Sequence, residues 1–104
     1  MNKKLKLEEL NRLSISEYAN SEKDPIVVIL DNIRSLNNVG SIFRTCDAFA
    51  VEKLILCGIT AKPPHREIRK TAIGATESVN WEYAESTNEA ITSCKALEYD
   101  CYAI

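Results

Sequence analysis

The residues best placed to do chemistry are Asn38, Gly40 and Arg44, which follow the apolar run 26–30 after a short polar loop. Asn38, or Asn37 before it, can cap a helix by accepting a backbone N–H. Helical side chains lean toward the N-terminus, so we expect the Arg44 guanidinium to lie over the bare surface at Gly40, one turn earlier. Free N–H groups of the first helical turn beside an arginine suit an anion. The spacing therefore predicts a phosphate site, and an ordinary helix with a solvated arginine is the alternative.

A helix and a strand must position this arginine. Apolar residues recur at helical spacing and predict a single face that packs on a sheet. The members of this stripe are Val39, Ile42, Phe43, Cys46, Phe49 and Ala50. The continuous apolar run 26–30 predicts a strand buried on both faces of a parallel sheet. Ligands bind outside the carboxyl ends of strands in open α/β sheets, so the loop 31–37 is a favoured location for a site.

The rest of the chain alternates between strands and helices. We expect strands at 53–58, 81–84 and 101–104, the second of them more exposed, and helices within 65–74 and from 88 to about 99. Together with the first strand and helix, this order is typical of a doubly wound, Rossmann-like α/β half, with a mostly parallel sheet and helices on both faces. Residues 1–24 would precede it as a short helical arm, which leaves residues 25–104 as the domain.

Two segments carry a resemblance to a known family. The pattern Asn38-x-Gly40-x-x-x-Arg44, after a strand that ends at Asp31, resembles the first motif of the SpoU/TrmH family. Residues 69–75 are similar to the second-helix region of that family, where a Ser or Thr precedes a Gly-Ala pair. Its members are RNA ribose 2′-O-methyltransferases of the SPOUT (α/β knot) class, which use S-adenosylmethionine. The glycine-rich loops of dinucleotide enzymes and nucleoside triphosphatases are absent from this sequence.

The resemblance implies transfer of a methyl group from S-adenosylmethionine to a ribose 2′-oxygen of tRNA or rRNA. It gives Arg44 the catalytic role, together with the substrate phosphate, while Asn38 fixes the loop and the start of the helix. The pKa of an arginine exceeds about 12, so orienting the phosphate and stabilising the developing alkoxide suit Arg44 better than acting as a base.

Two further motifs of the family, which belong to a knotted C-terminal segment, have no counterpart here. That segment holds the cofactor and pairs the subunits. We therefore expect this chain to be the N-terminal part of a longer enzyme that forms a homodimer. We expect no cofactor-binding residues in these 104 residues and little or no activity from them alone.

Basic residues are concentrated in the half of the domain that carries the motif. Lys and Arg outnumber Asp and Glu in residues 25–74, whereas acidic residues predominate in 75–104 and bring the net charge to −2. The segment 65–74 follows a loop that should open on the same sheet edge as the motif, so we expect contacts to RNA phosphates that position the substrate. The alternative for this segment is a helix face that is simply solvated. For His65 the alternative is a structural or exposed side chain that makes no contact with RNA. The candidate RNA-binding residues are Arg34, Lys62, His65, Arg66, Arg69 and Lys70.

Composition sets further limits. The four cysteines have no C-x-x-C spacing and there is one histidine, so we expect buried free thiols and no metal site. No apolar run reaches the roughly 20 residues that cross a bilayer, and the N-terminus lacks the apolar core of a secretory signal. We expect a cytoplasmic protein. The alternative function is a non-catalytic α/β module that binds RNA or another protein. A receiver-type phosphoacceptor is disfavoured because the third strand ends at Tyr83-Ala84-Glu85, without an Asp.

Overall fold

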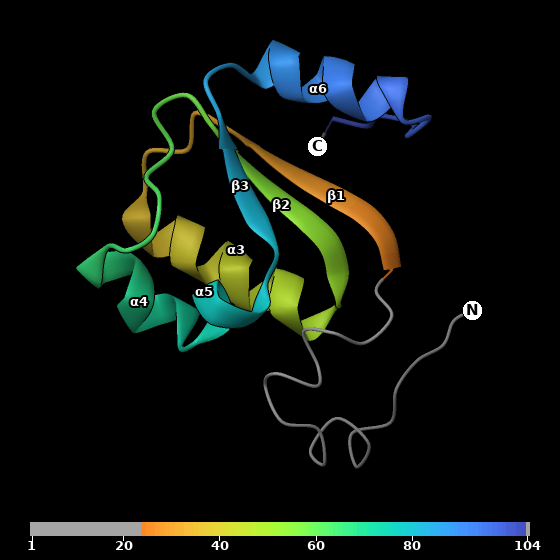
Figure 1. Ribbon diagram of the computed structural model, residues 1–104. Coiled ribbons are helices and arrows are strands. Elements are labelled where there is room, and N and C mark those ends of the chain that lie inside the picture. The colour runs from red at the N-terminus through yellow and green to blue at the C-terminus, as the bar shows by residue number, and fades with distance from the viewer. Residues whose placement is uncertain (1–23, 104) are drawn as a thin grey trace.

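Three parallel strands form the sheet, hydrogen-bonded in the order β1-β2-β3, and helices cover both of its faces (Figure 1). The computed structural model describes residues 24–103. The elements are β1 (Asp24–Asp31), α3 (Leu36–Ala48), β2 (Val51–Cys57), α4 (Arg66–Ala72), α5 (Ala75–Ser78), β3 (Trp81–Ala84) and α6 (Thr87–Ala96). The arm predicted for residues 1–24 lies outside the described residues, apart from Asp24 at the start of β1.

The centre of the sheet is β2. The prediction that the first strand is buried on both faces is confirmed only in part: residues 27–30 of β1 pack alternately on the two core clusters, but Leu30 is the one residue of this strand that is buried rather than partly exposed. In the described chain β2 pairs on both sides and residues 54–57 are buried, whereas β1 lies at an edge, with Ile26 49% exposed. An apolar run reports that a strand packs against a core, but it does not report the order of strands in the sheet. The more exposed position expected for the third strand is confirmed, since Glu82 and Tyr83 of β3 are exposed.

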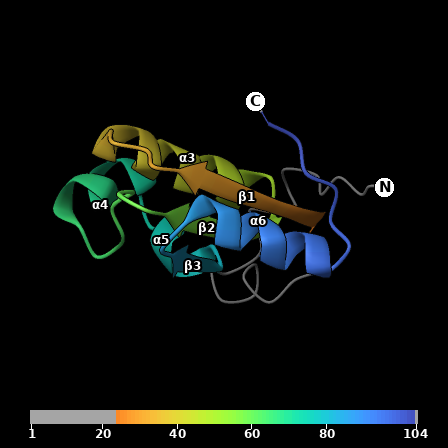
Figure 2. The same ribbon diagram turned by 90° about the horizontal axis from the view of Figure 1, so that it is seen from above.

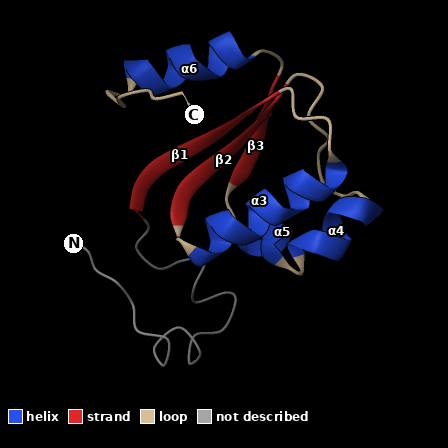
Figure 3. Ribbon diagram, turned by 180° about the vertical axis from the view of Figure 1, so that it is seen from behind, coloured by secondary structure: helices blue, strands red, loops and turns tan. Residues whose placement is uncertain are grey.

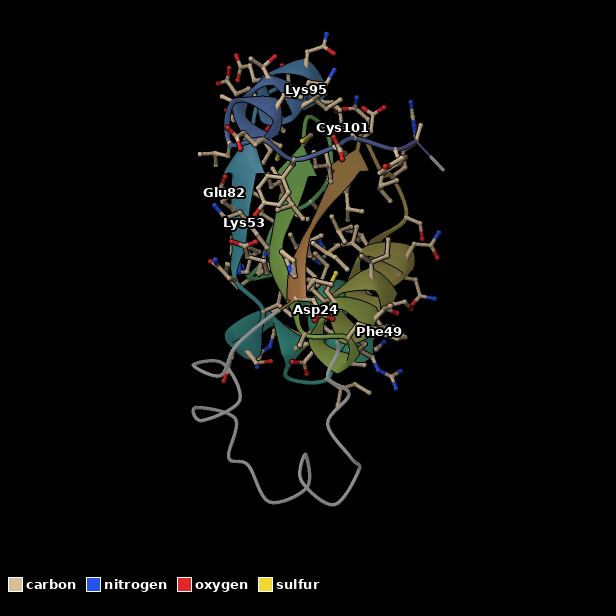
Figure 4. All side chains as sticks on the ribbon, turned by 90° about the vertical axis from the view of Figure 1, so that its right-hand side faces the viewer. Asp24, Phe49, Lys53, Glu82, Lys95 and Cys101 are labelled. Atoms are coloured by element: carbon tan, nitrogen blue, oxygen red, sulfur yellow. The ribbon has the colours of Figure 1, made fainter. Side chains whose placement is uncertain are left out.

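The helices divide between the two faces, as predicted. Alternate residues of β2 point to opposite sides, so Leu54 and Leu56 join one core cluster and Ile55 and Cys57 join the other. Helices α3, α4 and α5 cover the first side, and among residues 24–103 α6 is the helix that covers the second (Figures 2 and 3). On the second side Lys53 of β2 pairs with Glu82 of β3 at 3.4 Å (Figure 4).

Most of the apolar stripe predicted for the motif helix packs on the sheet. Val39, Phe43 and Cys46 of α3 are buried, and Ile42 is half-buried against the same cluster. Phe43 meets Trp81 edge to face, with ring centroids 6.4 Å apart. The helical periodicity therefore identified the face that holds α3 on the sheet.

The two last members of the predicted stripe do not belong to it. Phe49 is the C-cap of α3 and is 67% exposed, at the amino end of the sheet (Figure 4). Ala50 follows in the left-handed region, with φ 53°, and its carbonyl accepts from the N–H of Asp24 at 2.9 Å. The helix ends before the apolar spacing does, because the chain must turn here to enter β2.

The helix begins at a different cap from the one expected. Ser35 is the N-cap of α3, with extended backbone angles, and its hydroxyl accepts from the N–H of Asn38 at 3.1 Å. The prediction of Asn37 or Asn38 as the cap is wrong because both lie inside the first turn. Serine and asparagine are equally good caps, so the composition of this loop left the choice open.

Two other boundaries differ from the prediction. Residues 75–78 form the short helix α5, which was expected only as a lead into the third strand. No strand forms at residues 101–103, which have no regular secondary structure and are exposed. Within the described chain this segment makes no ladder hydrogen bond, and a strand exists only through such bonds to a neighbour.

The expectation of buried free thiols holds for three of the four cysteines. Cys46, Cys57 and Cys94 are buried and Cys101 is exposed. Burial, with a smaller effect of the Asp47 charge, raises the pKa of the Cys46 thiol to about 11. Burial also raises the pKa of Cys57 and of Cys94. Among residues 24–103 no group of His, Cys, Asp and Glu side chains is arranged to hold a metal ion, and no helix is long and apolar enough to span a membrane.

Helices α3 and α4 touch at Gly40, which is buried in their interface. A Cβ at position 40 would stand 1.7 Å from the hydroxyl oxygen of Thr71 and 2.8 Å from the carbonyl oxygen of Ile68. The same hydroxyl of Thr71 lies 3.4 Å from the carbonyl of Asn37 in the first turn of α3. Because one of the clashing atoms is backbone, a side chain at position 40 would have to push the helices apart.

We expect Gly40→Ala to lower the free energy of unfolding of the 104-residue chain by about 1–3 kcal/mol, the usual cost of overpacking. Ser41→Ala is the matched control, because Ser41 is the next residue along the helix and is exposed. Urea unfolding followed by circular dichroism measures both. Equal midpoints for Gly40→Ala and the unsubstituted chain would contradict the packing described here.

Candidate functional site

The loops that follow the three strands meet at the carboxyl end of the sheet (Figure 1). They are residues 32–35 after β1, residues 58–65 after β2 and residues 85–86 after β3. In parallel α/β sheets this edge is where ligands bind. The motif helix α3 and the basic helix α4 both start from it.

Asn32 joins the first two loops. Its side-chain oxygen accepts from the N–H of Ile59 at 2.9 Å, and its side-chain nitrogen donates to Asp31 at 3.0 Å. Asn32 has φ 54°, which asparagine tolerates better than most residues. Facing it, Gly58 has φ 64°, and a Cβ there would stand 1.9 Å from the Asn32 oxygen. The loops close on each other only because position 58 has no side chain.

Thr60 and Asp31 extend this connection. The buried hydroxyl of Thr60 accepts from the N–H of Ile33 at 2.9 Å and lies 3.4 Å from the carbonyl of Leu30. Asp31 accepts from the hydroxyl of Thr87, at the start of α6, at 2.6 Å. The three loops are thus tied into one unit, which we call the loop latch and define as Asp31, Asn32, Gly58, Thr60 and Thr87.

Sequence reasoning missed the loop latch. A signal was available, because an asparagine directly after one strand and a glycine directly after the next are the residue types that tolerate positive φ. Nothing in the chain order pairs Asn32 with Ile59, however, since the bond spans 27 residues.

The structure brings the predicted basic residues to this edge in two groups. Arg34 and Lys62 lie on the first and second loops, which the bond between Ile33 and Thr60 joins. The other group lies on α4 or at its start and consists of His65, Arg66, Arg69 and Lys70. The α4 cations are exposed, on the side away from the buried Ile68 and Ala72.

Most of these cations have no carboxylate partner. Lys70 lies 3.8 Å from Glu67, and the ammonium of Lys62 lies 4.3 Å from the ring centroid of Tyr83. In the part of the chain that the structure describes, Arg34, Arg66 and Arg69 make no ion pair. The surface therefore keeps its positive charge available to an anion.

The structural alternative for His65 has direct support. His65 is the N-cap of α4, and its Nδ1 accepts from the N–H of Glu67 at 3.2 Å. This bond occupies one ring nitrogen, so only Nε2 is left for a ligand. The RNA contact proposed for His65 stays a prediction.

The bare helix surface that was expected at Gly40, as a place for the Arg44 guanidinium, does not exist. Thr71 and Ile68 of α4 fill the space beside Gly40, so the Arg44 guanidinium cannot lie across it. Gly40 has no side chain because helix α4 packs closely against α3 at this position. A sequence alone cannot distinguish such a packing site from space left for a ligand. Arg44 itself is exposed on α3, one turn beyond this crossing, and makes no ion pair within residues 24–103.

Asn38 contributes its backbone to the start of α3 through the bond to Ser35. Its side chain is exposed and makes no hydrogen bond among the described residues. The amide is thus available to a ligand, whereas the role of fixing the helix start belongs to Ser35. The catalytic parts assigned to Arg44 and Asn38 stay predictions.

Known proteins resemble this chain over most of its length. Residues 25–104 match the SpoU rRNA Methylase family. The 23S rRNA (guanosine-2'-O-)-methyltransferase RlmB of Haemophilus ducreyi is 31% identical over 71 residues, which are 68% of this chain and 29% of that protein.

Solved structures of the SpoU methyltransferase AviRb from Streptomyces viridochromogenes share the fold. One superposes with a TM-score of 0.65 at 25% identity, covering 77% of this chain and 31% of AviRb. A second, of AviRb in complex with the cofactor AdoMet, gives the same score and identity and covers 32% of that protein. The chain spans less than a third of the length of these relatives.

The loop latch makes a prediction of its own. Asn32→Gly keeps the positive φ and removes the side chain, so we expect a loss of about 1–2 kcal/mol in the free energy of unfolding and faster hydrogen exchange at the Ile59 N–H. Glu98→Gly is the control, because Glu98 also has a positive φ, 71°, and is exposed. Exchange at Ile59 as slow in Asn32→Gly as in the control would show that the side chain does not hold the loop.

Proposed function

This chain belongs to the SpoU rRNA Methylase family, and from that membership we propose that residues 25–104 supply the N-terminal, RNA-facing part of an S-adenosylmethionine-dependent RNA ribose 2′-O-methyltransferase. The observation that carries the proposal is the family match over the whole domain, which includes the motif helix α3 and its exposed Arg44. The named activity of RlmB favours rRNA over tRNA as the substrate. We further propose that the protein acts in the cytoplasm as a homodimer, as the family resemblance implies.

Arg44 is the residue we assign to the reaction. A ribose hydroxyl is a poor nucleophile, and negative charge develops on its oxygen as the methyl group is transferred. A guanidinium stays protonated throughout the physiological range and can hold two oxygens of a phosphate at once. An exposed Arg44 without a carboxylate partner in the described chain can therefore orient the substrate phosphate and stabilise the developing alkoxide. The exposed amide of Asn38 gives a second polar contact from the same helix.

The loops and α4 supply the RNA surface in this proposal. Arg34 and Lys62 are carried by the two loops that Asn32 and Thr60 hold together, so their backbone positions are fixed before RNA arrives. Such contacts to phosphate set affinity and register and make both depend on salt.

S-Adenosylmethionine supplies the methyl group in this proposal. The polar side chains of the loop latch do not fit as its binding site, because Asp31, Asn32 and Thr60 already bond to one another's loops. The residues of this chain contribute the binding and orientation of RNA and, through Arg44, stabilisation of the developing alkoxide.

We expect Arg44→Ala to lower kcat/KM for methyl transfer by about 10²–10³ in the protein that contains this chain, the usual effect of removing one electrostatic stabiliser. Incorporation of a labelled methyl group into rRNA measures it, with urea unfolding to verify the fold. Lys95→Ala is the matched control, since Lys95 is an exposed cation on α6, across the sheet.

Two results would overturn the assignment. Unchanged turnover in Arg44→Ala would remove Arg44 from the reaction. Loss of RNA affinity in that variant, in a protein that transfers no methyl group before substitution, would favour the alternative of a non-catalytic RNA-binding module.

A further inference from the structure

An aromatic ring and a cation meet at the end of β3. The ammonium of Lys62, on the loop after β2, lies 4.3 Å from the ring centroid of Tyr83. The hydroxyl of Tyr83 donates to the carbonyl of Gly58 at 2.8 Å, so the ring is held at both ends, by its strand and by the neighbouring loop. Neither contact involves α3, so the pair is separate from Arg44.

The ring remains accessible although Lys62 lies over it. Tyr83 is 38% exposed, and Ile59, which follows Gly58, is 59% exposed. Side chains two apart on a strand point to the same face, so Tyr83 lies on the side of the sheet where Trp81 packs against Phe43. This is the side that carries α4 and its cations.

The positive charge of Lys62 is also available to an anion. In the described chain Lys62 makes no ion pair, and its contact is the aromatic face. A fixed aromatic ring under an unpaired cation has a partner for each part of a nucleotide: the Lys62 ammonium leaves the ring for the phosphate, and the base stacks on the ring in its place.

We propose that Tyr83 and Lys62 form a stacking site for one unpaired nucleotide of the RNA, with the base on the Tyr83 ring and its phosphate at Lys62. The inference rests on the proposed function and adds the kind of RNA bound. A base within a duplex is covered on both faces by its neighbours, so only a single-stranded loop, bulge or end can offer one to this ring. In the proposed function, Arg44 holds the phosphate of a different nucleotide of the same RNA.

The test uses binding of a ten-nucleotide single-stranded RNA to the 104-residue chain, measured by fluorescence anisotropy over a series of salt concentrations. We expect Tyr83→Leu to weaken binding about tenfold with an unchanged salt slope, because stacking is not ionic. Tyr83→Phe keeps the ring and is the matched control, expected within about twofold of the unsubstituted chain. Lys62→Met should lower the salt slope by about one, because it removes one phosphate contact.

A second comparison needs no variant of the protein. The same oligonucleotide without bases should bind the unsubstituted chain at least tenfold more weakly, and a fully paired duplex should gain nothing from Tyr83. Equal affinity for the oligonucleotides with and without bases, or equal affinity of Tyr83→Leu and Tyr83→Phe, would overturn the stacking site while leaving RNA binding in place. Absence of any RNA binding by the unsubstituted chain would overturn the proposed function itself. If this patch binds a protein instead of a base, removal of the bases or of the Tyr83 ring will leave the affinity for RNA unchanged, which overturns the stacking site.

Discussion

The close contact of α3 and α4 at Gly40 is the constraint on which the arrangement of the site depends. Because Thr71 and Ile68 occupy the space that a side chain at position 40 would need, the two helices lie nearly backbone to backbone. Arg44 follows Gly40 by one helical turn, so it lies on the side of α3 that meets α4, the helix that carries Arg66, Arg69 and Lys70. A wider crossing would separate the two helices and divide one basic surface into two.

The loop latch makes that surface more rigid with only a few side-chain hydrogen bonds. Asn32, Thr60 and Asp31 each bond to a loop other than their own, and the sheet beneath fixes where those loops begin. Residues carried by fixed loops lose less conformational freedom when a ligand arrives, so more of the contact energy contributes to affinity. The bond between Tyr83 and Gly58 has the same effect on the edge strand.

The sequence predicts the elements of this fold well and their contacts poorly. Helical spacing places Val39, Phe43 and Cys46 on the buried face of α3, and apolar runs place the strands. The same spacing wrongly includes Phe49, because a period does not report where the chain must turn. The prediction of a bare surface at Gly40 fails for a related reason, since the absence of a side chain does not identify what fills the space.

What could not be predicted is non-local. The bond between Asn32 and Ile59 spans 27 residues. The central position of β2 likewise follows only from the pairing of three separate strands. The basic residues themselves could be found from their types and positions, because charge in a loop or on an exposed helix face needs no partner to be recognised. Their grouping at one edge follows from the parallel direction of the strands.

The placement of α6 on the face opposite α3 and α4 has an electrostatic consequence (Figure 2). Acidic residues predominate in residues 75–104, which include this helix, whereas most cations of the described residues lie on α3, on α4 and on the loops that precede them. The described residues thus form a dipole whose positive side is the face of the sheet that carries α3 and α4. A polyanion that diffuses toward it is turned into one orientation before any contact forms, and repulsion keeps it from the opposite face.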